Sequence, residues 1–210
     1  RCCTQNGIRG GSATVHFPIW HQEIEDIIVL KNNKGTEDNR VRKLDYSIQT
    51  SKIFYERFIE DSNITLFSPH DVPGLYDAFG TDEFDDLYTR YESDETIPKK
   101  TVRAQALILD ILKERAETGR LYLMNIDHCN THSSFKDKVN MSNLCQEITL
   151  PTDPLQHIDG EGEIALCILS AINVGRINKL DELENLCDLS VRGLELSLIH
   201  ISEPTRPVTI

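Results

Sequence analysis

Short apolar strands alternate with amphipathic helices along this chain, and that alternation limits the fold more than any other feature of the sequence. Branched and aromatic residues predict extended segments at 13–20, 64–67, 121–126, 142–150 and 164–173. Apolar residues at helical spacing predict helices at 23–30, 41–59, 75–79, 83–91, 101–120 and 180–194. Strands separated by helices favour an α/β fold with a parallel sheet, formed by one domain or by part of one.

Two segments give the sharpest local predictions. The helix expected at 101–120 starts at Thr101 and stops at Gly119. Its apolar side is expected to carry Ala106, Leu109 or Ile108, Leu112 and Ala116. The run at 164–173 is largely apolar, which predicts a mostly buried strand.

The charge of the chain argues against nucleic-acid and membrane-surface binding, and its hydropathy argues against a membrane-spanning helix. The chain has 22 Lys and Arg against 34 Asp and Glu, so its net charge is 22 − 34 = −12. Binding to nucleic acid or to an anionic membrane surface needs an excess of basic residues, and neither is expected. No apolar run approaches the roughly 18 to 20 residues of a membrane-spanning helix.

Six cysteines are spread over 210 residues without a CxxC pair. That density is too low for a disulfide-stapled secreted domain, so we expect a reducing compartment and a cytoplasmic protein. The chain starts at Arg1 without Met and without an apolar leader, and we interpret it as a fragment.

The most informative stretch surrounds Cys145. If residues 142–150 are extended, Asn143, Cys145 and Glu147 project from one face. A neighbouring carboxylate raises the pKa of a thiol, which suits a thiol that exchanges a hydrogen atom better than a thiolate nucleophile. Glu147 could accept a proton from a substrate hydroxyl, and Asn143 could hold the neighbouring one. The alternative is a strand with a buried Cys and a solvated Glu.

Two further groups of residues carry weaker signals. Cys167 lies in the apolar run, and by itself it predicts a core cysteine. His128, Cys129 and His132 have the spacing of metal ligands, but no second ligand pair lies at zinc-like spacing, so no metal is expected. A zinc-stabilised interaction module remains the alternative from a different functional class. Zinc quantitation of the purified protein would separate that module from an enzyme that uses Cys145.

Six segments together resemble the large, catalytic subunit of aerobic (class I) ribonucleotide reductase. They are RGG at 9–11, LKNN at 30–33, LFSPHDVPGLY at 66–76, DHCNTH at 127–132, SNLC at 142–145 with Glu147, and GEIALC at 162–167. Their order and approximate spacing agree with the family from about Cys3 to about Leu196. An adenosylcobalamin-dependent reductase is the closer rival, because it shares the barrel and an Asn-x-Cys-x-Glu loop.

The resemblance implies part of a ten-stranded α/β barrel whose central finger loop carries a radical cysteine. By that analogy Cys145 is the thiyl radical site that takes the 3′ hydrogen from a ribonucleoside diphosphate. Glu147 would take the proton of the 3′ hydroxyl, and Asn143 would hydrogen-bond the ribose hydroxyls. Cys167 would be one half of the redox pair that reduces the 2′ carbon. Gln5 and Arg9 match base- and phosphate-contacting positions of the loop that reports which effector nucleotide is bound.

The resemblance also implies partners. No cofactor is expected in this segment, because a separate small subunit with a dinuclear metal centre would supply the radical. ATP and deoxynucleoside triphosphates would act as effectors, thioredoxin or glutaredoxin as reductant, and the full-length subunit would dimerise.

Two expectations concern the ends of the chain. The family-like domain is expected at 1–196, with the partner thiol of Cys167 upstream and the phosphate-binding loop downstream, so the segment alone is expected to be inactive. Residues 197–210 lack the family pattern and are expected to be a disordered or artefactual tail without function.

Overall fold

The computed structural model describes residues 4–5, 7, 9–36, 38, 40–154, 157 and 162–202. The chain divides into two compact units, residues 1–152 and 153–210. Each unit is described by itself.

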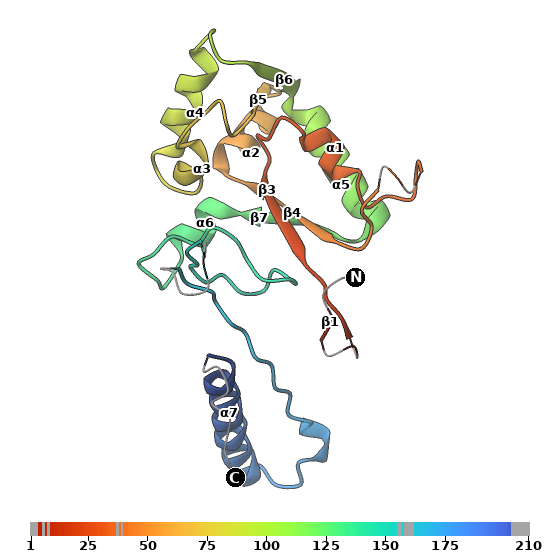
Figure 1. Ribbon diagram of the computed structural model, residues 1–210, viewed down its shortest axis with the longest axis vertical. Helices are drawn as coiled ribbons and strands as arrows, with labels where there is room; N and C mark the ends of the chain where they lie inside the picture. The colour runs from red at the N-terminus through yellow and green to blue at the C-terminus, as the bar shows by residue number, and fades with distance from the viewer. Residues whose placement is uncertain are drawn as a thin grey trace. The chain divides into compact units, whose positions relative to one another are not determined.

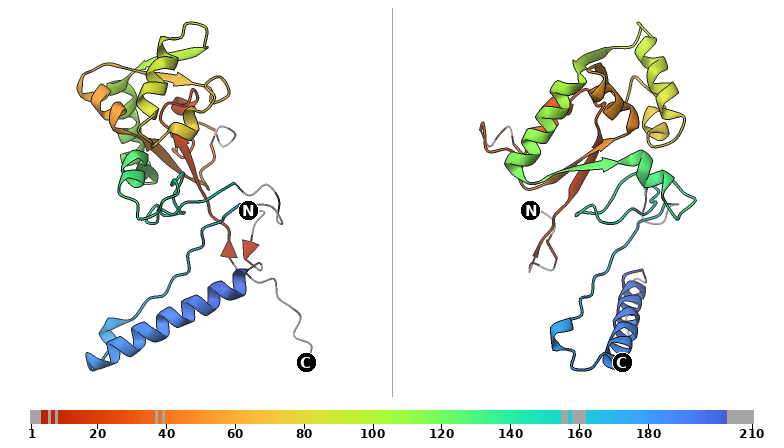
Figure 2. Two further views of the ribbon diagram at one scale, coloured as in Figure 1. Left: turned by 90° about the vertical axis from the view of Figure 1, so that its left-hand side faces the viewer. Right: turned by 180° about the vertical axis from the view of Figure 1, so that it is seen from behind.

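A three-stranded parallel sheet forms the centre of the first unit. Its strands are β3 (Thr14–Pro18), β4 (Asp45–Thr50) and β7 (Leu121–Asn125), with β4 in the middle. Figures 1 and 2 place α1 (Ile24–Ile28), α2 (Lys52–Ile59) and α5 (Ala104–Thr118) on one side of this sheet. The segment that follows β7 lies on the other side, so the sheet is covered on both faces as parallel sheets are.

Smaller elements complete the first unit. β5 (Asn63–Phe67) and β6 (Lys99–Arg103) pair antiparallel, as do β1 (Thr4–Gln5) and β2 (Arg9–Gly10). Helices α3 (Leu75–Ala78) and α4 (Phe84–Ser93) lie between β5 and β6 in the chain. Helix α6 (Ile126–Thr131) follows β7 directly.

Aromatic rings fill the core between α2, α4 and β5. Phe54 lies in edge-on or tilted contact with Phe79, Phe84 and Tyr88, at centroid distances of 5.4–6.3 Å. The buried Tyr88 hydroxyl donates to the Thr65 carbonyl at 2.7 Å and accepts from the Thr65 amide at 2.9 Å. Burial raises the pKa of Tyr88, and the hydrogen bonds to Thr65 fix the ring in the core.

The second unit carries little regular structure before its helix. Asp153 and Glu163 form an antiparallel bridge, a 3-10 turn spans Val174–Arg176, and α7 runs over Asp181–Ser202. The helix begins where the sequence predicts it, and it continues beyond the expected end at residue 194. The prediction of an unstructured tail from residue 197 is therefore not met up to Ser202, and residues 203–210 lie outside the described part of the chain.

Most predicted elements are confirmed, among them the strands near 13–20, 64–67 and 121–126, but the helix predicted at 41–59 is wrong in its first half. Residues 45–50 form the central strand, and helix begins only at Lys52. Five consecutive residues from Tyr46 to Thr50 are buried, as in a strand covered on both faces. The polar residues Ser47 and Gln49 alternate with Tyr46 and Ile48, and the sequence alone does not distinguish this pattern from a helix with one polar side.

The apolar face predicted for the helix at 101–120 is also wrong, apart from the alternative Ile108, which is half-buried against the core. Strand β6 includes Thr101, so the helix starts at Ala104, while Gly119 ends it in the left-handed conformation as predicted, with φ 66°. The buried positions are Ala104, Leu107, Ile111 and Glu114. Leu109 and Leu112 are 56% and 43% exposed instead. Apolar residues occur on two sides of this helix, and the buried Glu114 makes the true core stripe look interrupted.

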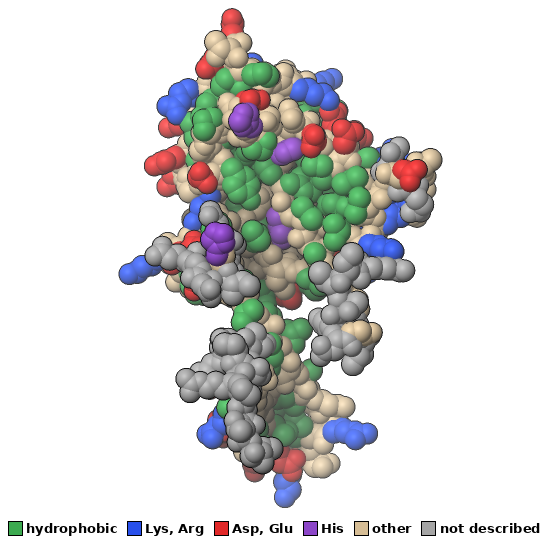
Figure 3. Space-filling model, viewed as in Figure 1, with side chains coloured by type: hydrophobic (Ala, Val, Ile, Leu, Met, Phe, Trp, Pro, Cys, Tyr) green, Lys and Arg blue, Asp and Glu red, His purple; other side chains and the backbone are tan. Residues whose placement is uncertain are grey.

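The buried strand predicted at 164–173 is not present. The segment has no regular structure, and Ile164 and Leu169 are 61% and 80% exposed. Hydrophobic side chains reach the surface of both units (Figure 3). An extended segment needs neighbouring strands to satisfy its backbone, and the described part of the second unit provides none for this run.

Candidate functional site: a cysteine loop on the polar face of the sheet

The predicted reactive residues lie in a loop over the polar face of the sheet. We call residues 139–150 the Cys145 loop. Side chains alternate along β4, so Ser47 and Gln49 face the side opposite to Ile48. Both are almost fully buried, at 0% and 1% exposure, because the Cys145 loop covers them.

Four side-chain hydrogen bonds hold the Cys145 loop to the three strands. Gln49 Nε2 donates to the Asn140 carbonyl at 2.5 Å, and Thr14 Oγ1 donates to the Leu144 carbonyl at 2.6 Å. Ser47 Oγ donates to Gln146 Oε1 at 2.5 Å, and Gln146 Nε2 donates to the Leu123 carbonyl of β7 at 2.6 Å. Each strand of the sheet thus contributes one anchor or more.

The loop closes on itself rather than running as an extended strand. The Gln146 amide donates to the Asn143 carbonyl at 3.1 Å, which makes a turn with Leu144 and Cys145 at its centre. Asn143 Oδ1 accepts from the Ile148 amide at 3.1 Å, and Ser142 Oγ donates to the Ile148 carbonyl. The predicted strict alternation of faces over 142–150 is therefore wrong.

Each residue of the predicted trio has a different environment. Cys145 and Glu147 are exposed. Asn143 is half-buried, and its amide oxygen is used to close the loop. Among the described residues its Nδ2 has no protein partner, so the amide nitrogen is the part of Asn143 that is free to donate.

The remaining predicted site residues lie elsewhere. Cys167 belongs to the second unit and is exposed, not part of a core strand. Gln5 and Arg9 are paired in the register of β1 and β2, but their side chains lie outside the described part of the structure.

Sequence reasoning missed the residues that support the Cys145 loop. No catalytic pattern marks these residues, which are Thr14, Ser47, Gln49 and Gln146. They hold the loop through hydrogen bonds between residues up to 130 positions apart in sequence. His16 lies on the same face of the sheet, and both its ring nitrogens are buried without a partner among the described residues. Burial lowers the pKa of His16, with an opposing effect from the backbone of Ser142.

His128 and Cys129 lie in helix α6, and His132 follows its last residue. The two imidazole rings meet edge-on with their centroids 5.9 Å apart, whereas Cys129 packs against the core. The three side chains therefore do not converge, and within the described ranges no group of three Cys, His, Asp or Glu has metal-binding geometry.

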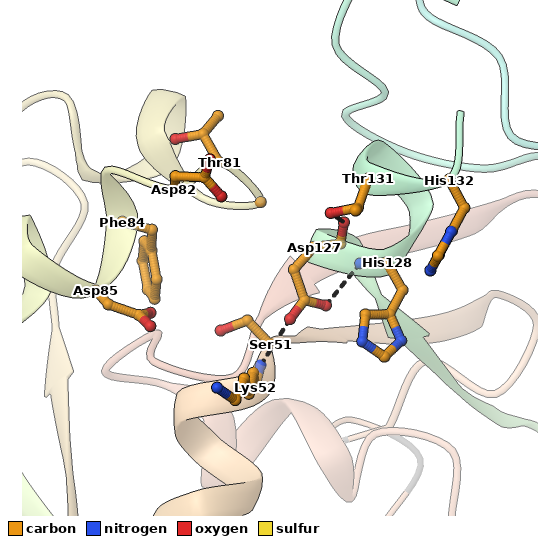
Figure 4. A pocket seen from close by; sticks show the side chains of 11 residues that line it. Ser51, Lys52, Thr81, Asp82, Phe84, Asp85, Asp127, His128, Thr131 and His132 are labelled. Carbon is orange, nitrogen blue, oxygen red and sulfur yellow. Dashed lines mark hydrogen bonds between the residues drawn. The ribbon is translucent and has the colours of Figure 1, made fainter. Parts of the chain in front are cut away.

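An acidic pocket of about 400 Å³ lies where β4 and β7 end (Figure 4). Asp127 joins the two strand ends, because its carboxylate accepts from the Lys52 amide and from the His128 amide, both at 2.8 Å. The Ser51 hydroxyl is directed toward Asp85 across the pocket. Burial and the charges of Glu56 and Asp127 raise the pKa of Asp85, so this end of the sheet is electronegative.

The parallel sheet and the Cys145 loop define an α/β protein that exposes a thiol and a carboxylate two residues apart on one loop. The chain belongs to the ribonucleotide reductase family, because residues 1–209 match the model of the ribonucleotide reductase barrel domain. The resemblance noted in the sequence is thereby confirmed. The described residues form seven strands, of which three make the parallel sheet, so the ten-stranded barrel stays a prediction.

Individual relatives agree with this assignment. The chain is 56% identical over 210 residues to the ribonucleoside-diphosphate reductase subunit alpha of Haemophilus influenzae, covering 97% of the chain and 28% of the relative. It is 54% identical over 160 residues to the subunit alpha of ribonucleoside-diphosphate reductase 1 of Escherichia coli, covering 74% of the chain and 21% of the relative. The large subunit of Plasmodium falciparum is 38% identical over 180 residues, covering 85% of the chain and 21% of the relative. The chain thus spans between a fifth and a third of these relatives.

No helix within the described residues has the length and apolar character that crossing a membrane requires.

Proposed function

We propose that this chain is part of the catalytic subunit of a ribonucleoside-diphosphate reductase and carries its radical cysteine, Cys145. The observation that supports this most directly is the anchored loop, which exposes Cys145 and Glu147 on the same short segment. Membership of the family and relatives named as ribonucleoside-diphosphate reductases agree with the proposal. The product would be a 2′-deoxyribonucleoside diphosphate for DNA synthesis.

The proposed reaction begins and ends at the Cys145 sulfur. As a thiyl radical it takes the 3′ hydrogen atom of the ribose, which forms S–H and leaves a radical at C3′. Glu147 accepts the proton of the 3′ hydroxyl, and the Asn143 amide donates to a ribose hydroxyl. The 2′ hydroxyl takes a proton from the thiol pair and leaves as water, and Glu147 returns its proton to the 3′ oxygen when C3′ regains its hydrogen.

The electrons come from a pair of thiols. Cys167 and a second thiol give two electrons and two protons and become a disulfide, and Cys145 returns its hydrogen to C3′. One nucleoside diphosphate and two thiols thus give one deoxynucleoside diphosphate, one disulfide and one water. Thioredoxin or glutaredoxin would reduce the disulfide for the next turnover.

Other parts of the proposal concern partners. The radical would come from a separate small subunit with a dinuclear metal centre. Gln5 and Arg9 would belong to the loop that senses ATP or deoxynucleoside triphosphate effectors, and the full-length subunit would act as a cytoplasmic dimer.

Substitution of single residues in the full-length subunit tests these roles. Cys145→Ser, Glu147→Gln and Cys167→Ser should each reduce turnover of a nucleoside diphosphate by several orders of magnitude, whereas Cys187→Ser should not. Cys187 is a matched control because it is also an exposed thiol, in helix α7. Abstraction of the substrate 3′ hydrogen should be lost in Cys145→Ser. Full turnover in that variant would refute the proposal.

The 210-residue chain alone should not reduce nucleoside diphosphates, because the proposal requires a second thiol for Cys167 and a radical source. Measurable production of deoxynucleotide by the isolated chain would contradict this part.

A further inference from the structure

Gln146 stands between the two proposed reacting residues in sequence and points the other way. Cys145 and Glu147 are exposed, while Gln146 is half-buried and reaches the sheet. Its amide oxygen accepts from Ser47 on β4 at 2.5 Å, and its amide nitrogen donates to the Leu123 carbonyl on β7 at 2.6 Å. One side chain therefore connects the loop to two adjacent strands.

The backbone at Gln146 is unusual as well. Its φ is 63°, in the left-handed region that residues with a Cβ seldom occupy unless their surroundings hold them there. The two side-chain hydrogen bonds provide that restraint. They act on Gln146, the last residue of the turn that holds Cys145, and Thr14 holds the carbonyl of Leu144 on the other side of Cys145.

We propose that Gln146 is a positioning residue, which bridges Ser47 and the Leu123 carbonyl and thereby turns Cys145 and Glu147 away from the sheet toward the substrate. The inference rests on the proposed function and deepens it. A half-buried bridge between strands and loop also contributes to folding, so the test must separate orientation from stability.

Steady-state kinetics on the intact subunit, assayed with its small subunit, make that separation. Gln146→Leu keeps a side chain of similar size and removes both hydrogen bonds. We expect kcat to fall about tenfold, because reacting groups lose their alignment, while KM for the nucleoside diphosphate stays within about twofold. Ser47→Ala should lower kcat in the same direction. The double variant should be no worse than Gln146→Leu, because both changes remove one bridge.

A control variant tests whether loss of any side-chain hydrogen bond lowers kcat, and a second variant replaces Gln146→Leu if that protein does not fold. Thr118→Val removes the two hydrogen bonds of the Thr118 hydroxyl, to the Glu114 carbonyl at 2.7 Å and from the Arg120 amide at 3.4 Å, and should leave kcat unchanged because neither reaches the Cys145 loop. If Gln146→Leu does not fold, Gln146→Glu keeps an acceptor for Ser47 but loses the donor to Leu123, and its kcat should fall by a smaller factor.

Three results would overturn the inference: an unchanged kcat in Gln146→Leu, a fall explained wholly by a smaller folded fraction in thermal unfolding, or additive effects of the two substitutions. Failure of the proposed function is recognised separately, because Cys145→Ser would then retain turnover. An inactive Cys145→Ser together with an unchanged Gln146→Leu removes only the positioning role.

Discussion

The side chain of Asn130 forms two hydrogen bonds with the backbone of Val139. Its Oδ1 accepts from the Val139 amide at 2.8 Å, and its Nδ2 donates to the Val139 carbonyl at 3.0 Å. The same Nδ2 donates to the Ile126 carbonyl at 2.9 Å, so Asn130 joins the start of α6 to the start of the Cys145 loop. The loop thus has a fixed base in addition to its four anchors on the sheet.

We expect Asn130→Ala to lower the free energy of unfolding by about 2–3 kcal/mol, because it leaves the buried polar groups of Val139 without partners. Urea denaturation measures the change. Asn33→Ala, at an exposed position, is the control and should change stability little. A loss below about 0.5 kcal/mol in Asn130→Ala would show that water replaces the amide without cost.

Gly80 and Gly74 offer a matched pair for measuring how tightly Asn130 is packed. Both have positive φ, at 92° and 78°, but a Cβ on Gly80 would lie 2.9 Å from Asn130 Nδ2 and from Ile126 Cγ1, whereas a Cβ on Gly74 would meet nothing within 4 Å. Gly74→Ala should cost about 1–2 kcal/mol for the left-handed backbone alone. Gly80→Ala should cost about 1–3 kcal/mol more because of the overlap. Equal losses in urea denaturation would mean that the neighbours move aside freely.

The sequence predicts the strands and helices whose local pattern matches their burial. The aromatic and branched residues of β3 and the left-handed stop at Gly119 are of this kind. It fails at β4, because polar Ser47 and Gln49 are buried by a loop about a hundred residues later, and no local pattern contains that contact. It fails at 164–173 for the opposite reason, because an apolar run predicts burial but does not supply the neighbours that would bury it.

Part of the candidate site could be predicted from the sequence, and part of it could not. Cys145, Glu147 and Asn143 are found from their residue types and their resemblance to a known family. The turn at Cys145 and the orientation of Gln146 are not, because they depend on hydrogen bonds to Thr14, Ser47 and Leu123. The residues proposed to react are recognisable from sequence, and those proposed to orient them are recognisable only in the fold.

The acidic pocket leads to a prediction on pH dependence. Because the pKa of Asp85 is raised in the folded state, the folded chain holds this proton more tightly than the unfolded chain does. The contribution of Asp85 therefore lowers the free energy of unfolding as pH rises through its raised pKa. Asp85→Asn should remove that loss, so the variant should be more stable than the parent at neutral pH, with the gain disappearing in acid below the ordinary pKa of Asp.

Urea denaturation of both proteins over a series of pH values measures this effect. Asp110→Asn removes an exposed carboxylate of α5 that does not line the pocket, and it controls for the change in net charge. A gain in Asp85→Asn that is the same at acid and neutral pH would contradict the electrostatic explanation.

Alkylation rates of the thiols test the environments assigned to the cysteines. Cys145, Cys167 and Cys187 are exposed, whereas Cys129 is half-buried and packs on the core. Burial, with a smaller effect from Asp127, raises the pKa of the Cys129 thiol and lowers its thiolate fraction. With iodoacetamide at neutral pH, followed by mass spectrometry of the peptides, Cys129 should react more slowly than the other three. Asp127→Asn should accelerate Cys129 and leave Cys187 unchanged. If Cys129 reacts as fast as Cys145 in the folded chain, Cys129 does not pack against the core as described. If Asp127→Asn raises the rates at Cys129 and Cys187 equally, the cause is general unfolding and not a local charge effect.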